Sequence, residues 1–148
     1  MAVSSVDSSK FPGTTTNDAT VGDIAWTTPD NVQAEEGVNF ATVAIESDGN
    51  VDSHYLKATN FGFTIPAEGI ITDISLRVKK KVSAGSGVRD NSIKLVIGGV
   101  IHDAAEVADG GTNWPTTLGN TTYGGRLSNW QLIDIAPAVV NASDFGVV

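Results

Sequence analysis

Two aspartates and an asparagine at alternating positions give the chain its first candidate for chemistry, a calcium loop. Asp48, Asn50 and Asp52 stand at the spacing of the first three ligands of an EF-hand loop. The pattern then fails, because Ser53 stands where the loop needs glycine and Thr59 where it needs a bidentate glutamate. A solvated turn is the preferred interpretation, and a calcium site is the alternative.

A second acidic group, formed by Asp103, Glu106 and Asp109, lies close to His102 in the sequence. Carboxylates on one loop could hold a hard cation, although a charged loop tip is the preferred interpretation. Neither His54 nor His102 stands in a pattern typical of a catalytic or metal site, and the chain contains no G-x-S-x-G, Walker or H-E-x-x-H motif. We therefore predict no catalytic residue, no metal ligand and no cofactor.

Basic residues are concentrated around one segment of a chain whose net charge is −8. More than half of the nine basic residues lie there, namely Arg77, Lys79, Lys80, Lys81 and Arg89. The preferred interpretation is a wet sheet face or an edge strand guarded by lysine. The alternative is a patch that meets an acidic surface on a partner or on another copy. For that alternative, the candidate partner-binding residues are Lys10, Phe11, Arg77, Lys79, Lys81 and Arg89.

Aromatic residues in or near predicted loops offer a different kind of site. Trp114, Tyr123 and Trp130 could form a platform on which a sugar ring stacks, since binding residues are often carried on loops. Packing in the core or at its rim is the preferred interpretation, because aromatic side chains in a small sandwich usually pack there.

Short strands must position all of these side chains. In the predicted strand at 70–82, Ile74, Leu76 and Val78 alternate with polar residues, which indicates a sheet with one buried and one wet face. Further strands are predicted at 24–26, 38–46, 54–58, 60–65, 92–97, 100–102, 121–123, 130–135 and 145–148. A hairpin turn is predicted at 98–99 and a short helical or turn segment at 137–143. The pattern predicts an all-β fold, an antiparallel β-sandwich of jelly-roll-like form with minor helix only.

Length and composition limit the remaining possibilities. The 148 residues fit one domain, which we place at 13–148 after a Ser-rich flexible arm at 1–12. The acidic surface is unfavourable for binding nucleic acid, and no apolar run is long enough to span a membrane. The chain contains no cysteine, which excludes a disulfide or a thiolate site.

Several segments together resemble one protein family. They are Thr27–Asn31 with Ala41–Val43, Tyr55–Pro66, Trp114–Thr117 with Tyr123–Gly125, and Ile135–Gly146. In these segments the chain resembles a group of small β-sandwich proteins encoded in bacteriophage and prophage structural regions. The resemblance covers about residues 22–148 and carries no catalytic residues. Relatives of this kind continue beyond the Phe-Gly-Val segment. The expectations are that this sandwich is shorter, that the sequence is incomplete, or that the last strand is supplied or paired by a neighbouring copy.

This resemblance implies a non-enzymatic virion protein. The expected role is a capsid decoration (cement) protein that bridges neighbouring shell subunits. It would be synthesised in the host cytoplasm and bind the major capsid protein on the capsid surface as a homotrimer or another symmetric homo-oligomer. The alternative is a tail or fibre accessory domain that binds surface carbohydrate through Trp114, Tyr123 or Trp130. An enzyme ranks last, because no pair of carboxylates stands at a spacing typical of glycan cleavage.

Overall fold

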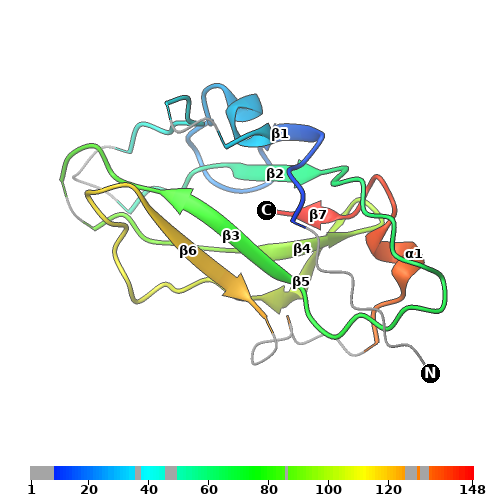
Figure 1. Cartoon of the computed structure of the whole chain (residues 1–148). Helices are drawn as coiled ribbons and strands as arrows, with labels where there is room; N and C mark the ends of the chain where they lie inside the picture. The colour runs from blue at the N-terminus through cyan, green and yellow to red at the C-terminus, as the bar shows by residue number, and fades with distance from the viewer. Residues whose placement is uncertain (1–8, 36–37, 46–49, 86, 126–129, 131–133) are drawn as a thin grey trace.

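The computed structural model describes residues 9–35, 38–45, 50–85, 87–125, 130 and 134–148. Seven strands occur in this part of the chain: β1 (Thr14–Asp18), β2 (Tyr55–Thr59), β3 (Ser75–Lys80), β4 (Lys94–Ile97), β5 (Val100–Glu106), β6 (Gly119–Gly124) and β7 (Gly146–Val147). They form a five-stranded sheet in the order β1-β2-β7-β4-β5 and a two-stranded sheet of β3 and β6 (Figure 1). All pairings between these strands are antiparallel.

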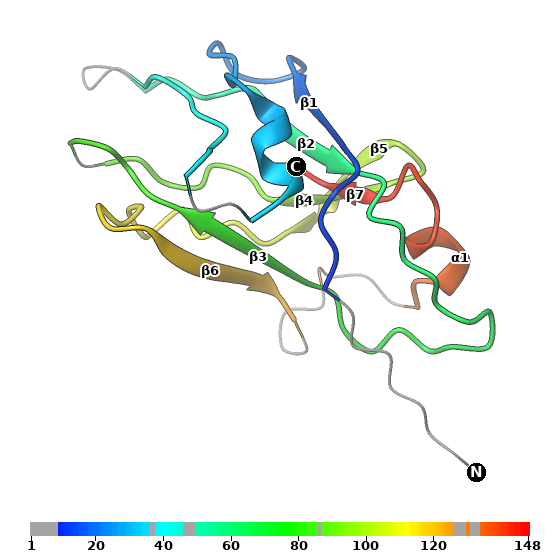
Figure 2. The same cartoon turned by 45° about the horizontal axis from the view of Figure 1, so that its top comes forward.

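The all-β prediction is confirmed. The helical elements among the described residues are a 3-10 helix η1 (Pro29–Gln33) and a single turn of helix α1 (Pro137–Val140). Both begin with proline, whose fixed φ suits the first position of a helix. Figure 2 shows β3 and β6 as a layer separate from the larger sheet, with η1 beside β1.

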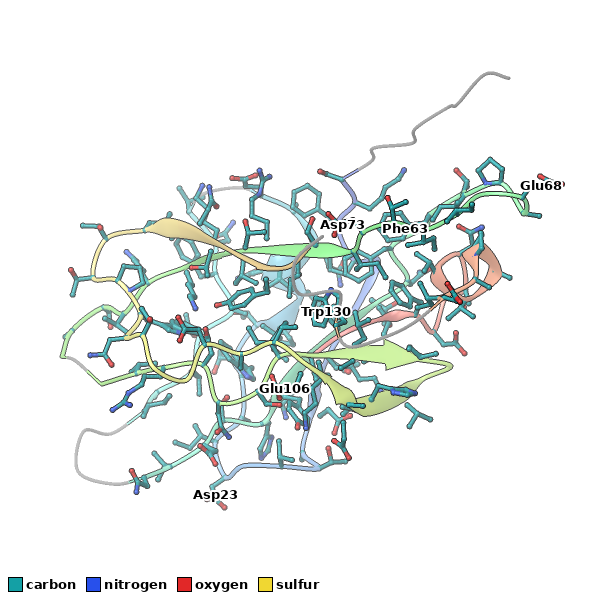
Figure 3. The ribbon with its side chains drawn as sticks, turned by 90° about the horizontal axis from the view of Figure 1, so that it is seen from below. Asp23, Phe63, Glu68, Asp73, Glu106 and Trp130 are labelled. Carbon is teal, nitrogen blue, oxygen red and sulfur yellow. The ribbon has the colours of Figure 1, made fainter. Side chains whose placement is uncertain are left out.

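The apolar core lies between the two sheets. Leu76 of β3 and Tyr123 of β6 pack toward Leu95 of β4 and Ala105 of β5. Trp130 belongs to the same cluster and is only 1% exposed. In Figure 3 its side chain lies between the ribbon of β3 and that of β5. The alternating residues of β3 therefore face the core on one side and solvent on the other, as the sequence predicts.

Several predicted strands differ from the observed ones. The strand predicted at 70–82 pairs only over Ser75–Lys80, because β6 offers six partner residues, from Gly124 opposite Ser75 to Gly119 opposite Lys80. No strand covers the described part of 38–46, where Thr42 makes a single bridge to Thr27. Residues 24–26 and 60–65 also form no strand.

The strand β1 lies in a segment expected to be only turn, because its sequence TTTND has no apolar residue to reveal it. The strand predicted at 130–135 falls partly outside the described residues. The hairpin at 98–99 is confirmed, since β4 and β5 flank Gly98 and Gly99 directly.

The last strand, β7, lies inside the larger sheet and not at its edge. It pairs with β2 on one side and with β4 on the other. Gly146 is needed there, since a Cβ at this position would overlap the carbonyl of Ala58. Both edges of β7 are thus used within the chain, and a neighbouring copy has no free edge of β7 to pair with.

Candidate functional site

The most unusual side chain of the structure is Lys80, at the end of β3. It follows Leu76 and Val78 at two-residue intervals and therefore points inward with them. Lys80 is 8% exposed, although lysine is almost never buried unless it is paired. The sequence carried this signal, since residues 74, 76, 78, 80 and 82 form one series and only the fourth is charged. The sequence-based interpretation instead counts Lys80 among the exposed basic residues of the strand, and it therefore does not identify Lys80 as buried.

Four side chains form the Lys80 cluster, which consists of Lys80, Asp90, Trp114 and Tyr123. The Nζ atom of Lys80 lies 2.8 Å from both carboxylate oxygens of Asp90, which is itself 8% exposed. Trp114 Nε1 donates to Oδ1 of Asp90 at 2.7 Å, and the hydroxyl of Tyr123 donates to Oδ2 at 2.6 Å. Lys80 Nζ also donates to the Tyr123 hydroxyl. The carboxylate is thus saturated by three donors.

The end of β3, the strand β6 and two loops bring these residues together. Lys80 ends β3 and Tyr123 lies in β6, while Asp90 precedes β4 of the other sheet. The loop that carries Trp114 is held beside Asp90 because Trp114 N donates to the carbonyl of Val88 at 2.8 Å. The cluster therefore joins the two layers of the fold at one end of the core.

Burial controls the electrostatics of the cluster. Desolvation, followed by the hydrogen bond and the charge of Asp90, raises the pKa of Tyr123 well above its ordinary value of 10.0. The ammonium group of Lys80 lies 4.9 Å from the ring centre of Trp114 and 5.0 Å from that of Tyr123, within the range of cation–π attraction. A cavity of about 80 Å³ adjoins Lys80 and Asp90, with Asp109 and Thr121 also in its wall.

The predicted partner-binding residues fall into separate groups. Arg77 and Lys79 share the outward face of β3, and both contact Glu35, at 3.7 and 3.1 Å respectively. Lys81 Nζ lies 5.7 Å from the ring centre of Phe40. We call Arg77, Lys79 and Lys81 the basic face.

The remaining predicted partner-binding residues do not belong to the basic face. Arg89 lies in the loop before β4, where its side chain donates to the carbonyl of Gly110 at 3.5 Å. Lys10 and Phe11 are exposed just before β1. Residues 1–8 of the predicted arm lie outside the described residues.

The three candidate sugar-binding aromatics are not exposed together. Tyr123 is 4% exposed and Trp130 is 1% exposed, and the indole nitrogen of Trp130 donates to the carbonyl of Ile74 at 2.7 Å. Trp114 is half-buried and donates to Asp90. Two of the three rings therefore belong to the core and present no free face to a sugar.

The acidic residues are also dispersed. Asp103 pairs with Lys94 at 2.9 Å, whereas Glu106 accepts hydrogen bonds from the backbone nitrogens of Ile93 and Ala108. No group of three or more histidine or acidic residues in the described part of the chain could hold a metal ion. Asp48, from the calcium-loop pattern, lies outside that part.

The histidines have different surroundings. His54 Nδ1 lies 2.8 Å from the side-chain nitrogen of Asn17, and His102 is exposed on β5. The hydrogen bond to Asn17 ties His54 to β1 and gives it a structural contact.

Within the described residues, no helix combines the length and the apolar character needed to cross a membrane. Comparison of the chain with protein-family models, curated proteins and solved structures finds no match.

Proposed function

We propose that this protein is a non-enzymatic structural component of a bacteriophage particle, and that it decorates the capsid as a symmetric homo-oligomer, most simply a trimer. The proposal starts from the resemblance of residues 22–148 to β-sandwich proteins of phage structural regions. A decoration protein needs no active site. It needs a stable body and a surface that meets the shell many times over, since repeated weak contacts give avidity.

The basic face is the observation that carries the proposal. Arg77 is exposed on the outer side of the two-stranded sheet, with 59% of its side chain accessible, in a protein of net charge −8. Glu35 is the acidic partner of both Arg77 and Lys79 and compensates one of their two charges. A concentrated positive surface on an acidic body suits an acidic patch on the major capsid protein, and it orients the approach of the two proteins.

The test is binding of purified protein to shells of the parent particle that lack it, followed by cryo-electron microscopy. The double variant Arg77→Ser/Lys79→Ser removes two positive charges from the basic face and should lower occupancy on the shell. Asn50→Asp/Asn91→Asp is the matched control, because it changes the net charge equally at two exposed positions outside the basic face. Many copies of the wild type at three-fold positions are expected. A few copies at the tail, or equal occupancy of both variants, would contradict the proposal.

A further inference from the structure

The Lys80 cluster places an amine and a carboxyl group in direct contact away from water. Nζ of Lys80 is equidistant, at 2.8 Å, from both oxygens of Asp90. Only 7% of the Lys80 side chain and 5% of the Asp90 side chain are accessible. Groups fixed at contact distance react as if at very high concentration, because the entropy of bringing them together is already lost in folding.

Proton transfer within the pair produces the uncharged forms that can react. Ionic groups lose their hydration in a buried site, which narrows the free-energy gap between an ammonium–carboxylate pair and a neutral amine–acid pair. Transfer of one proton from Nζ to the carboxyl group converts the first pair into the second. The neutral amine of Lys80 is then a nucleophile beside the carboxyl carbon of Asp90.

Two further side chains stand where such a reaction needs them. Trp114 Nε1 donates to Oδ1 of Asp90 at 2.7 Å and can stabilise the negative charge that develops there when the carbon becomes tetrahedral. The hydroxyl of Tyr123 accepts a hydrogen bond from Nζ and donates one to Oδ2 at 2.6 Å. It therefore links the attacking nitrogen to the leaving oxygen and can pass a proton between them.

We propose that Lys80 and Asp90 become joined by an intramolecular isopeptide bond between Nζ and the side-chain carbonyl carbon. The Nζ–Cγ bond forms, the bond from Cγ to Oδ2 breaks, and Oδ2 leaves as water with two protons that were on Nζ. One ammonium and one carboxylate give one amide and one water, so the step needs no oxidant, cofactor or activated group. The adjoining cavity of about 80 Å³ is large enough to receive the released water.

The bond would join the two layers of the fold covalently. Lys80 ends β3 in the two-stranded sheet, and Asp90 precedes β4 in the five-stranded sheet. This inference does not depend on the role in a phage particle, since it concerns a modification that the chain performs on itself.

The test is the mass of the intact, denatured full chain. We expect the folded wild-type protein to weigh one water molecule less than its sequence requires. Lys80→Arg is the control, because it retains a positive charge without a reactive amine and should have its full mass. Both proteins undergo the same processing at their ends, so the comparison isolates the lost water. A wild-type chain with its full mass would overturn the proposal, whether or not the variant folds.

Peptide mapping then locates the bond and tests the assigned roles. After trypsin digestion, tandem mass spectrometry should find the peptide that begins at Asp90 attached to the one that contains Lys80. Loss of water at another pair of residues would overturn the assignment. Tyr123→Phe keeps the ring but removes the hydroxyl, so freshly purified variant should contain mostly unlinked chain. Complete linkage in this variant, as fast as in the wild type, would contradict the relay through Tyr123.

Discussion

Asp90 accepts hydrogen bonds from three different side chains, so its loss removes the acceptor of two buried donors and one half-buried donor. Relative to the wild-type chain before any isopeptide bond forms, we expect Asp90→Ala to lower the free energy of unfolding by about 3–5 kcal/mol, because an unpaired lysine remains in a low-dielectric site. Urea denaturation measures this change. Asp103→Ala is the matched control, since Asp103 also pairs with a lysine, at 2.9 Å, but 90% of its side chain is exposed. A loss for Asp103 as large as that for Asp90 would contradict the role of burial.

Tyr123 makes stability depend on alkaline pH. Burial and Asp90 raise the pKa of Tyr123 in the folded protein above the ordinary value of 10.0, so the unfolded chain loses this proton first. The contribution of Tyr123 to stability is complete below pH 10 and disappears as the pH rises toward the folded-state pKa. In a Tyr55→Phe variant, where Tyr123 is the sole tyrosine, ultraviolet absorbance should detect tyrosinate only as the protein unfolds. Reversible ionisation near pH 10 in the folded state would contradict this.

Residue patterns indicated some of the site and missed its centre. The sequence pattern offers Trp114 and Tyr123 as an alternative sugar platform, whereas in the structure both side chains donate hydrogen bonds to the carboxylate of Asp90. Lys80 was visible as the one charge in an apolar series, whereas nothing near Asp90 in the sequence marks it as its partner. That pairing depends on how the loop before β4 meets the end of β3, which a local pattern does not reveal.

At the scale of the elements, the backbone conformation at the end of β6 requires a glycine. Gly124 has a φ of 71°, and a Cβ there would overlap Trp130 Nε1 and approach the carbonyl of Ile74, which Trp130 binds. Gly124→Ala should lower the free energy of unfolding by about 2–4 kcal/mol through backbone strain and overpacking. Gly119→Ala, at the other end of the same strand, meets only contacts of 3.8 Å or more and should change stability far less. Equal unfolding midpoints in urea for the two variants would contradict this account.

Strands were predictable where one face is buried and not where both faces are polar. The alternation of Leu76 and Val78 correctly indicated β3, and its length was overestimated because pairing ends with β6. The polar strand β1 gave no such signal, and it is held by pairing with β2 and by Thr15, which donates to Asp30 of η1 at 2.7 Å. Tertiary contacts thus define the elements that periodicity leaves out.

For the whole molecule, the proposed attachment to a capsid has a measurable electrostatic signature. Arg77 and Lys79 lie on the outer surface, where salt screens their attraction to an acidic shell within a Debye length of about 10 Å at 0.1 M. Attachment of the wild type should therefore weaken steadily as salt increases, mainly through slower association. Arg77→Ser/Lys79→Ser should bind more weakly at low salt and respond less to added salt. Co-sedimentation with empty shells over a salt series measures both slopes.

Because the Lys80 cluster is buried, added salt should affect attachment to the shell and the stability of the fold differently in this experiment. Salt screens buried charges much less than exposed ones, so the folded body should persist across the salt series while attachment declines. Circular dichroism of the free protein in the same buffers is the control for unfolding. Attachment that does not change with salt would mean that apolar or strand-edge contacts hold the protein to its partner. The residues to substitute would then be the exposed apolar residues Phe11, Ile70 and Val100. The basic face would in that case be interpreted as an edge strand that lysine protects from pairing with other strands.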